Sequence, residues 1–259
     1  MEFDKIYHKS CEDMSEISND SIGLVVTSPP YYNLKDYATW QDYSEYMQFI
    51  RRVLKECYRV LMPGRWICWN IQESIPFPPK QTEKERYCQP LSANTITAML
   101  SSQFLYEKTI IWYKGKGTAT QKMFGTYPLP GLIICSGLTE HIITARKPRG
   151  NFKECIPNEI KENSKITKKE WGEWAVDMWE FSPTRKSVSG HPAAFPIELP
   201  RRCIKLWSFC DEIVLDPFMG AGSTAIAAKQ EGRHYLGYEI HKDFIDDASL
   251  RIAAKTDIL

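Results

Sequence analysis

The segment Ile213–Gln230, IVLDPFMGAGSTAIAAKQ, constrains the fold more than any other part of the chain. Its short apolar run ends in Asp216-Pro217, and a glycine-rich turn then leads into an alanine-rich run that begins at Ser223. Glycine lets the backbone approach a ligand closely, and the start of a helix carries free N–H groups. The segment therefore predicts a strand, a glycine loop and a helix that together hold a nucleotide-like ligand.

The next apolar run, Tyr235–Tyr238, is followed at once by an acid, Glu239. An acid at the end of the second strand binds ribose hydroxyls in dinucleotide-binding folds. No lysine follows Gly222, so the loop is not a Walker loop and phosphoryl transfer is disfavoured. We expect the loop glycines to face the ligand, so a bulky side chain at Gly222 should block binding and leave the fold largely intact.

Apolar runs and segments of helical periodicity alternate along the 259 residues. Such alternation favours a mostly parallel sheet with helices on both faces, which is an α/β fold. We expect loops over 74–89 and over the polar, irregular stretch 147–190. Strands are predicted over 5–8, 22–28, 65–71, 105–113, 141–146, 213–215 and 235–238, and helices over 43–62, 90–103, 196–207, 223–230 and 241–254.

A second apolar run, Leu24–Val26, leads into two consecutive prolines. Proline has no N–H and a fixed φ, so a strand must end there in a stiff elbow. The elbow would present the hydroxyl of Ser28, the carbonyl of Pro29 and the ring of Tyr31. In open α/β sheets, ligands bind at the carboxyl ends of strands. The plain alternative is a strand that simply leaves the sheet.

The composition excludes several classes of protein. No apolar run approaches the length of a membrane span, and the N-terminus lacks the apolar segment of a secretory signal. The eight cysteines show no CxxC pair, and the five histidines do not join them at metal-ligand spacing. We therefore expect reduced thiols, no metal site and a cytoplasmic location.

Two motifs together carry a resemblance to a known family. TSPPY at 27–31 and DPFMGAGST at 216–224 are similar to the catalytic and cofactor motifs of the amino-methylating DNA methyltransferases. The catalytic motif comes first, which resembles the β-type permutation of that family. Further similar segments are LMPGRWICWNI, EHIITARK and HPAAFPIELPRRCIKLWS, so the resemblance spans nearly the whole chain except about 150–180.

The resemblance implies a doubly wound, Rossmann-like sheet that is circularly permuted and carries an inserted target-recognition lobe. Residues 1–113 would form the catalytic half of the core, and 191–259 the cofactor-binding half. Residues 114–190 would form a loop-rich insert that includes a late core strand at 141–146 and recognises DNA.

The cofactor that the resemblance implies is S-adenosylmethionine. Family members often carry an acid where Ser10 stands here, and Glu12 and Asp13 follow it, so the residue that contacts the adenine is open among these three. The cofactor-binding residues implied are Ser10, His191, Phe195, Pro196, Asp216, Phe218, Gly220, Gly222, Ser223, Thr224 and Glu239.

The elbow has the groups that methylation of an exocyclic amine needs. The Ser28 hydroxyl and the Pro29 carbonyl can accept hydrogen bonds from the amine, so that its lone pair localises as positive charge develops. Tyr31 would stack on a base that has been flipped out of the duplex. Pro30 stiffens the loop and completes the catalytic set, and the reaction needs neither a metal nor a covalent intermediate.

The target base follows only from the family pattern. A serine at the start of the motif favours the N4 amine of cytosine, whereas Asp or Asn favours the N6 amine of adenine. No Pro-Cys dipeptide occurs, so methylation at cytosine carbon 5 is set aside. The alternatives are an adenine-N6 enzyme of the same fold, an RNA or protein-amide methyltransferase, and an inactive DNA-binding subunit.

Double-stranded DNA is the expected partner, with a cognate restriction endonuclease that acts separately. The net charge is only +1, but residues 112–153 carry seven basic residues and a single acid. Such a stretch can track a phosphate backbone, although a solvated surface is the plain alternative. The candidate DNA contacts are Lys114, Lys116, Arg146, Lys147, Arg149, Arg185 and Lys186.

Overall fold

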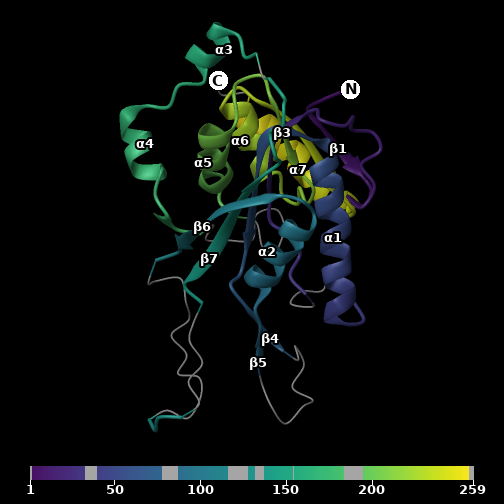
Figure 1. The fold of residues 1–259 in the computed structure, drawn as a ribbon, viewed down its shortest axis with the longest axis vertical. Helices are drawn as coiled ribbons and strands as arrows, with labels where there is room; N and C mark the ends of the chain where they lie inside the picture. The colour runs from purple at the N-terminus through teal and green to yellow at the C-terminus, as the bar shows by residue number, and fades with distance from the viewer. Residues whose placement is uncertain are drawn as a thin grey trace.

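The computed structural model describes residues 2–32, 40–77, 87–115, 128–131, 137–153, 155–183 and 195–256. An eight-stranded sheet runs through them in the order β1-β10-β9-β2-β3-β7-β6-β8 (Figure 1). The strands are β1 Lys5–His8, β2 Ile22–Thr27, β3 Leu61–Ile71, β6 Leu105–Tyr113, β7 Thr139–Arg146, β8 Met178–Glu180, β9 Ile213–Asp216 and β10 His234–Glu239.

The sheet is mostly parallel. Strands β1, β10, β9, β2 and β3 all run in one direction, and β7 runs against both β3 and β6. We call the edge where the parallel strands end the carboxyl edge, and the opposite edge the amino edge. Strands β9 and β10 come from the last quarter of the chain, yet they lie between β1 and β2. The prediction of a doubly wound, permuted α/β sheet is therefore confirmed.

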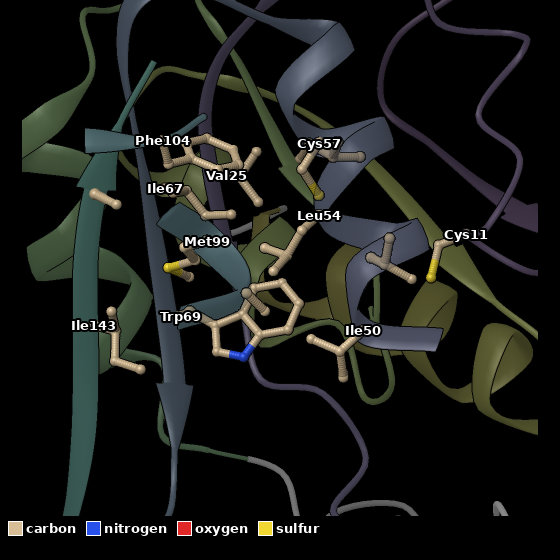
Figure 2. Close-up of a cluster of buried hydrophobic side chains, with 14 of the residues drawn as sticks. Cys11, Val25, Ile50, Leu54, Cys57, Ile67, Trp69, Met99, Phe104 and Ile143 are labelled. Atoms are coloured by element: carbon tan, nitrogen blue, oxygen red, sulfur yellow. The ribbon is translucent and has the colours of Figure 1, made fainter. Parts of the chain in front are cut away.

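Helices cover both faces of the sheet. Helices α1 (Tyr43–Val60) and α2 (Leu91–Ser101) bury their apolar sides in one core cluster, and α5 (Glu198–Trp207), α6 (Ser223–Gln230) and α7 (Lys242–Thr256) pack on the other face. In Figure 2, side chains from α1, α2 and the strands converge around Trp69. No helix in the described ranges is long and apolar enough to cross a membrane.

Helix α1 ends earlier than Pro63-Gly64, the stop that the sequence suggests. Leu61 is already extended, and β3 begins there without a connecting loop. The pairing of β2 with β3 shifts register between Ile22 and Leu24, so the extra residues of β3 bulge out. Proline lacks the N–H that a regular ladder needs, and a bulge is one of the places in a strand where it is tolerated.

The two stretches predicted to be loops contain short elements. Residues 74–89 hold an antiparallel pair, β4 (Ile75–Phe77) and β5 (Tyr87–Gln89), which follows the carboxyl end of β3. Residues 147–190 hold α3 (Asn158–Asn163), α4 (Lys168–Trp174) and β8. These elements are too short to show a clear hydrophobic period, so the sequence pattern did not indicate them.

Tertiary contacts stabilise α4. Its first turn has a capping box in which Thr167 and Glu170 bind each other's backbone N–H groups. The buried ring of Trp174 lies under the cationic groups of Arg201 and Lys205 on α5. The hydroxyl of Ser164, at the end of α3, accepts from the N–H of Cys210, which precedes β9. Helix α4 therefore packs on α5, and α3 lies beside the segment that precedes β9, near the amino edge and away from the β4–β5 pair (Figure 1).

Candidate active site

The carboxylate of Asp216 joins the two motifs of the sequence. Its Oδ1 accepts a hydrogen bond from the Thr27 hydroxyl at 2.5 Å and another from the Phe218 N–H at 3.0 Å. Its Oδ2 accepts from the Thr224 hydroxyl at 2.6 Å. Asp216 is fully buried. Burial raises the pKa of its carboxyl to about 6, although the three donors favour the charged form.

The glycine loop follows Asp216 and closes as a tight turn. The N–H of Gly222 donates to the Met219 carbonyl at 2.9 Å, and Gly220 and Gly222 have φ values of 47° and 77°. A Cβ on Gly222 would lie 3.1 Å from the Cβ of Ala248 on α7. A side chain at Gly222 would therefore point toward α7, so a bulky residue there would also disturb the fold, which needs glycine for its positive φ and for the close packing of α7.

The start of α6 meets the segment that precedes α5. Gly222 is the N-cap of α6 and has no side chain to cover the first amide groups. The Ser223 hydroxyl donates to the Phe195 carbonyl at 2.9 Å. Residues Phe195 and Pro196, predicted to bind the cofactor, thus lie beside the glycine loop, whereas His191 falls outside the described residues.

Glu239 ends β10 next to the same loop. Its Oε2 accepts from the Gly220 N–H at 3.0 Å, and its Oε1 accepts from the N–H groups of Ile240 and His241 at 2.8 and 2.9 Å. These donors hold the carboxylate in one orientation. A carboxylate oxygen has two lone pairs, so Oε2 can also accept a ligand hydroxyl. The position fits the predicted ribose contact.

Three residues were candidates for the adenine contact beyond β1. The Ser10 hydroxyl accepts from the Glu12 N–H at 3.3 Å, and the Glu12 carboxylate accepts from Arg52 at 2.5 Å. Asp13 instead forms an ion pair with Lys9 at 2.9 Å, with its side chain 65% exposed. The geometry favours Ser10 and Glu12, which are half-buried, over Asp13.

The elbow after β2 is anchored at both ends. Thr27, before it, is bound to Asp216. Tyr32, after it, is 4% exposed, and its ring packs edge-on against Tyr43 of α1 with the centroids 5.5 Å apart. Between these anchors Pro29 is buried, and Ser28, Pro30 and Tyr31 are half-buried. Sequence reasoning missed both anchors, because each depends on a partner that is distant in the sequence.

Aromatic side chains form an apolar wall beside the glycine loop. The Phe218 ring lies 5.9 Å from the Phe49 ring of α1 and 6.0 Å from the Trp69 ring of β3, measured between centroids. Thr27 is paired with Trp69 across β2 and β3, so this wall begins at the level of the elbow. These three rings therefore form an apolar surface that borders both the elbow and the glycine loop.

The structure divides the predicted DNA contacts between the two edges of the sheet. Lys114 follows β6 at the carboxyl edge and forms an ion pair with Glu140. Arg146 ends β7 at the level of Trp66, near the amino edge, and is paired with Glu107. Lys116, Arg185 and Lys186 lie outside the described residues.

Lys147 and Arg149 continue from Arg146 toward the amino edge. The Lys147 ammonium donates to Asp20, which precedes β2, and to the carbonyls of Tyr58 and Leu61, and its side chain is 12% exposed. Arg149 packs near Gly64 and donates to the Phe152 carbonyl. The geometry does not support DNA contacts by Arg146, Lys147 and Arg149, since they stand at the edge opposite the elbow. They stand there because β7 is antiparallel to β3 and β6, so its carboxyl end lies at the amino edge.

Comparisons with known proteins agree with this arrangement. The family model described as DNA methylase matches residues 22–250. Type II methyltransferase M.MthZI of Methanothermobacter thermautotrophicus is 30% identical over 275 residues, covering 96% of this chain and 76% of that protein. Type II methyltransferase M.MjaI of Methanocaldococcus jannaschii is 30% identical over 272 residues, covering 92% and 87%.

A solved structure is similar over the same length. A protein from Thermus thermophilus, solved as a complex with S-adenosyl-L-methionine, has a TM-score of 0.75 and 28% identity, and covers 93% of this chain and 91% of its own. The family match includes both the elbow and the glycine loop. The chain belongs to the DNA methylase family.

Proposed function

We propose that this protein transfers a methyl group from S-adenosylmethionine to the exocyclic N4 amine of a cytosine at a specific site in double-stranded DNA. The observation that carries the proposal is the hydrogen bond between Thr27 and Asp216. It places the elbow, with its acceptors for an amine, next to the glycine loop. A methyl donor in the loop and an amine at the elbow would then be neighbours.

The residues around the loop fit S-adenosylmethionine. Glu239 is oriented for ribose hydroxyls, the start of α6 offers amide groups, and Phe195 and Pro196 lie beside Ser223. Ser10 and Glu12 stand beyond β1, the strand next to β10. When bound, this cofactor supplies an electrophilic methyl group. The Thermus thermophilus structure, which holds the same molecule, supports the choice.

Methyl transfer itself would depend on the elbow. Ser28 Oγ and the Pro29 carbonyl would accept the two amine hydrogens and favour the localised lone pair that attacks the methyl group. Both acceptors are held before the base arrives, because Thr27 and Tyr32 anchor the elbow on either side. The half-buried ring of Tyr31 would stack on the flipped base.

DNA would approach the carboxyl edge, where the elbow lies. Residues 1–113 and 191–259 would supply the two halves of the core, and 114–190 would recognise the DNA. Within the described part of that insert, α3 and α4 stand near the amino edge. Lys114 lies at the carboxyl edge and is therefore better placed than these helices to contact the DNA. A separate endonuclease with the same recognition sequence would complete a restriction–modification pair.

The choice of cytosine rests on the serine that opens the motif, and adenine N6 is the second candidate. Purified protein would be incubated with genomic DNA and methyl-deuterated S-adenosylmethionine, and the DNA would then be digested to nucleosides. Chromatography with mass spectrometry separates the methylated bases. We expect labelled N4-methylcytosine. Labelled N6-methyladenine would replace the cytosine assignment, and label only in carbon-5-methylated cytosine, or none, would overturn the proposal.

A further inference from the structure

We infer that Thr27 is a positioning residue, whose hydrogen bond to Asp216 sets the distance between the amine acceptors of the elbow and the glycine loop. The inference rests on the proposed function. Thr27 is the last residue of β2, is fully buried and directly precedes Ser28. Its Oγ1 lies 2.5 Å from Asp216 Oδ1 and joins residues that are 189 positions apart in the sequence.

The backbone of the sheet does not provide this link. Paired residues of β2 and β9 are Leu24 with Val214 and Val25 with Leu215, and the pairing ends there. The elbow begins three residues after Val25. The Thr27 side chain thus connects the two strands beyond the last backbone pair, where they lead into separate loops.

The carboxylate of Asp216 connects the elbow, the glycine loop and the start of α6. Besides Thr27, Asp216 binds the Phe218 N–H at the start of the glycine loop and the Thr224 hydroxyl in the first turn of α6. Hydrogen bonds to an ionised group are short and strong, so they resist displacement. A shift of the elbow relative to the loop would have to break one of these bonds.

Loss of the Thr27 hydroxyl should therefore slow methyl transfer more than it weakens binding. A misplacement of about 1 Å between reacting groups can lower a rate by about 100-fold. Thr27→Val keeps the shape of the side chain and removes only the hydroxyl. Binding of the cofactor should change little, because the Phe218 and Thr224 bonds to Asp216 remain.

The chain offers a matched control. Thr144 on β7 is also a buried threonine of the same sheet, 2% exposed, and its hydroxyl donates to the Lys108 carbonyl at 2.8 Å. Thr144→Val removes a buried hydroxyl without touching Asp216. A loss that reflects only general stability should appear in both variants.

The test is single-turnover methylation of a cognate oligonucleotide, with dissociation constants for S-adenosylmethionine and DNA measured in parallel. For Thr27→Val we expect the rate to fall by about 10- to 100-fold, with both dissociation constants within about 3-fold of the wild type. Thr27→Ser keeps the hydroxyl and should recover most of the rate. Thr144→Val should methylate at nearly the wild-type rate.

Equal rates for Thr27→Val and Thr144→Val would show that the Thr27 bond only stabilises the fold and would overturn the inference. A loss of cofactor binding that accounts for the whole rate change would overturn it as well. If Thr27→Val does not fold, Thr27→Ala gives the same comparison without a branched side chain. A wild-type protein that methylates no DNA would refute the proposed function instead, so the two failures are distinguishable.

Discussion

The buried carboxylate of Asp216 lowers the stability of the fold by an amount that depends on pH. Asp216 has no exposed surface, and desolvation raises its pKa to about 6 from the ordinary 3.8. That value already includes a smaller contribution from charge repulsion by Glu239 and the opposing effect of the three hydrogen bonds. The folded state therefore binds a proton at Asp216 more tightly than the unfolded state does.

The sign of the effect follows from linkage. Between about pH 4 and pH 6 the folded protein binds more protons at Asp216, so this group's contribution to the free energy of unfolding falls as pH rises. A rise of about two units in the pKa of Asp216 lowers the free energy of unfolding by about 3 kcal/mol once the group is fully ionised, above pH 6. Asp216→Asn removes the titration and can keep the Thr27 and Phe218 contacts through its carbonyl oxygen.

We therefore predict that the free energy of unfolding of Asp216→Asn, relative to the wild type, increases between pH 4.5 and pH 7.5 by about 2–3 kcal/mol. Urea unfolding at several pH values measures the difference, and titrations common to both proteins cancel. A difference that stays constant with pH would show that Asp216 does not titrate in this range.

A second prediction concerns Gly222. Gly222→Ala should destabilise the fold by more than the cost of a positive φ, about 1–2 kcal/mol, because the new Cβ would meet Ala248 at 3.1 Å. Gly232→Ala is the matched control, with a φ of 69° and only an ordinary 3.8 Å contact to Cys210. Urea unfolding compares the two variants. If both variants lose the same free energy of unfolding, α7 can move away from the new Cβ at little energetic cost.

At the scale of elements, the long core strands and helices follow from the sequence, but the strand directions do not. The periodicity of α1 and the apolar runs of β2 and β9 match the structure closely. Strand β7 was also expected, yet its pattern does not show that it runs antiparallel. Direction comes from pairing with β3 and β6, which are distant in the chain. For that reason the sequence could not show that Lys114 and Arg146, which belong to one basic stretch, stand at opposite edges of the sheet.

This arrangement predicts different effects for Lys114→Gln and Arg146→Gln. Each cation is paired with a glutamate, Glu140 or Glu107, so the variants are matched. If Lys114 contacts a phosphate, its loss should reduce the salt dependence of DNA binding by about 0.9 log units per log unit of salt. Arg146→Gln should leave it unchanged. A reduction with Arg146→Gln, measured as affinity against salt concentration, would contradict the proposed approach of DNA.

At the scale of the whole molecule, the fold brings the two ends of the chain into one site. The elbow lies in the first eighth of the sequence and the glycine loop in the last fifth, and β2 pairs directly with β9. The two motifs and their order were sufficient to predict this proximity through the resemblance. The Asp216 contacts were not predictable, because a hydrogen bond across 189 positions leaves no local pattern.

The most direct test of the proposed role of the elbow is the rate of methyl transfer by Ser28→Ala in a single turnover. Ser28 follows β2, and Ser21, just before the same strand, offers a control in Ser21→Ala. Because the Ser28 acceptor matters most as the amine gains positive charge, we expect the rate to fall roughly 100- to 1000-fold with little change in affinity for DNA or S-adenosylmethionine. Ser21→Ala should methylate normally. A Ser28→Ala protein that methylates as fast as Ser21→Ala would show that the elbow does not act on the amine.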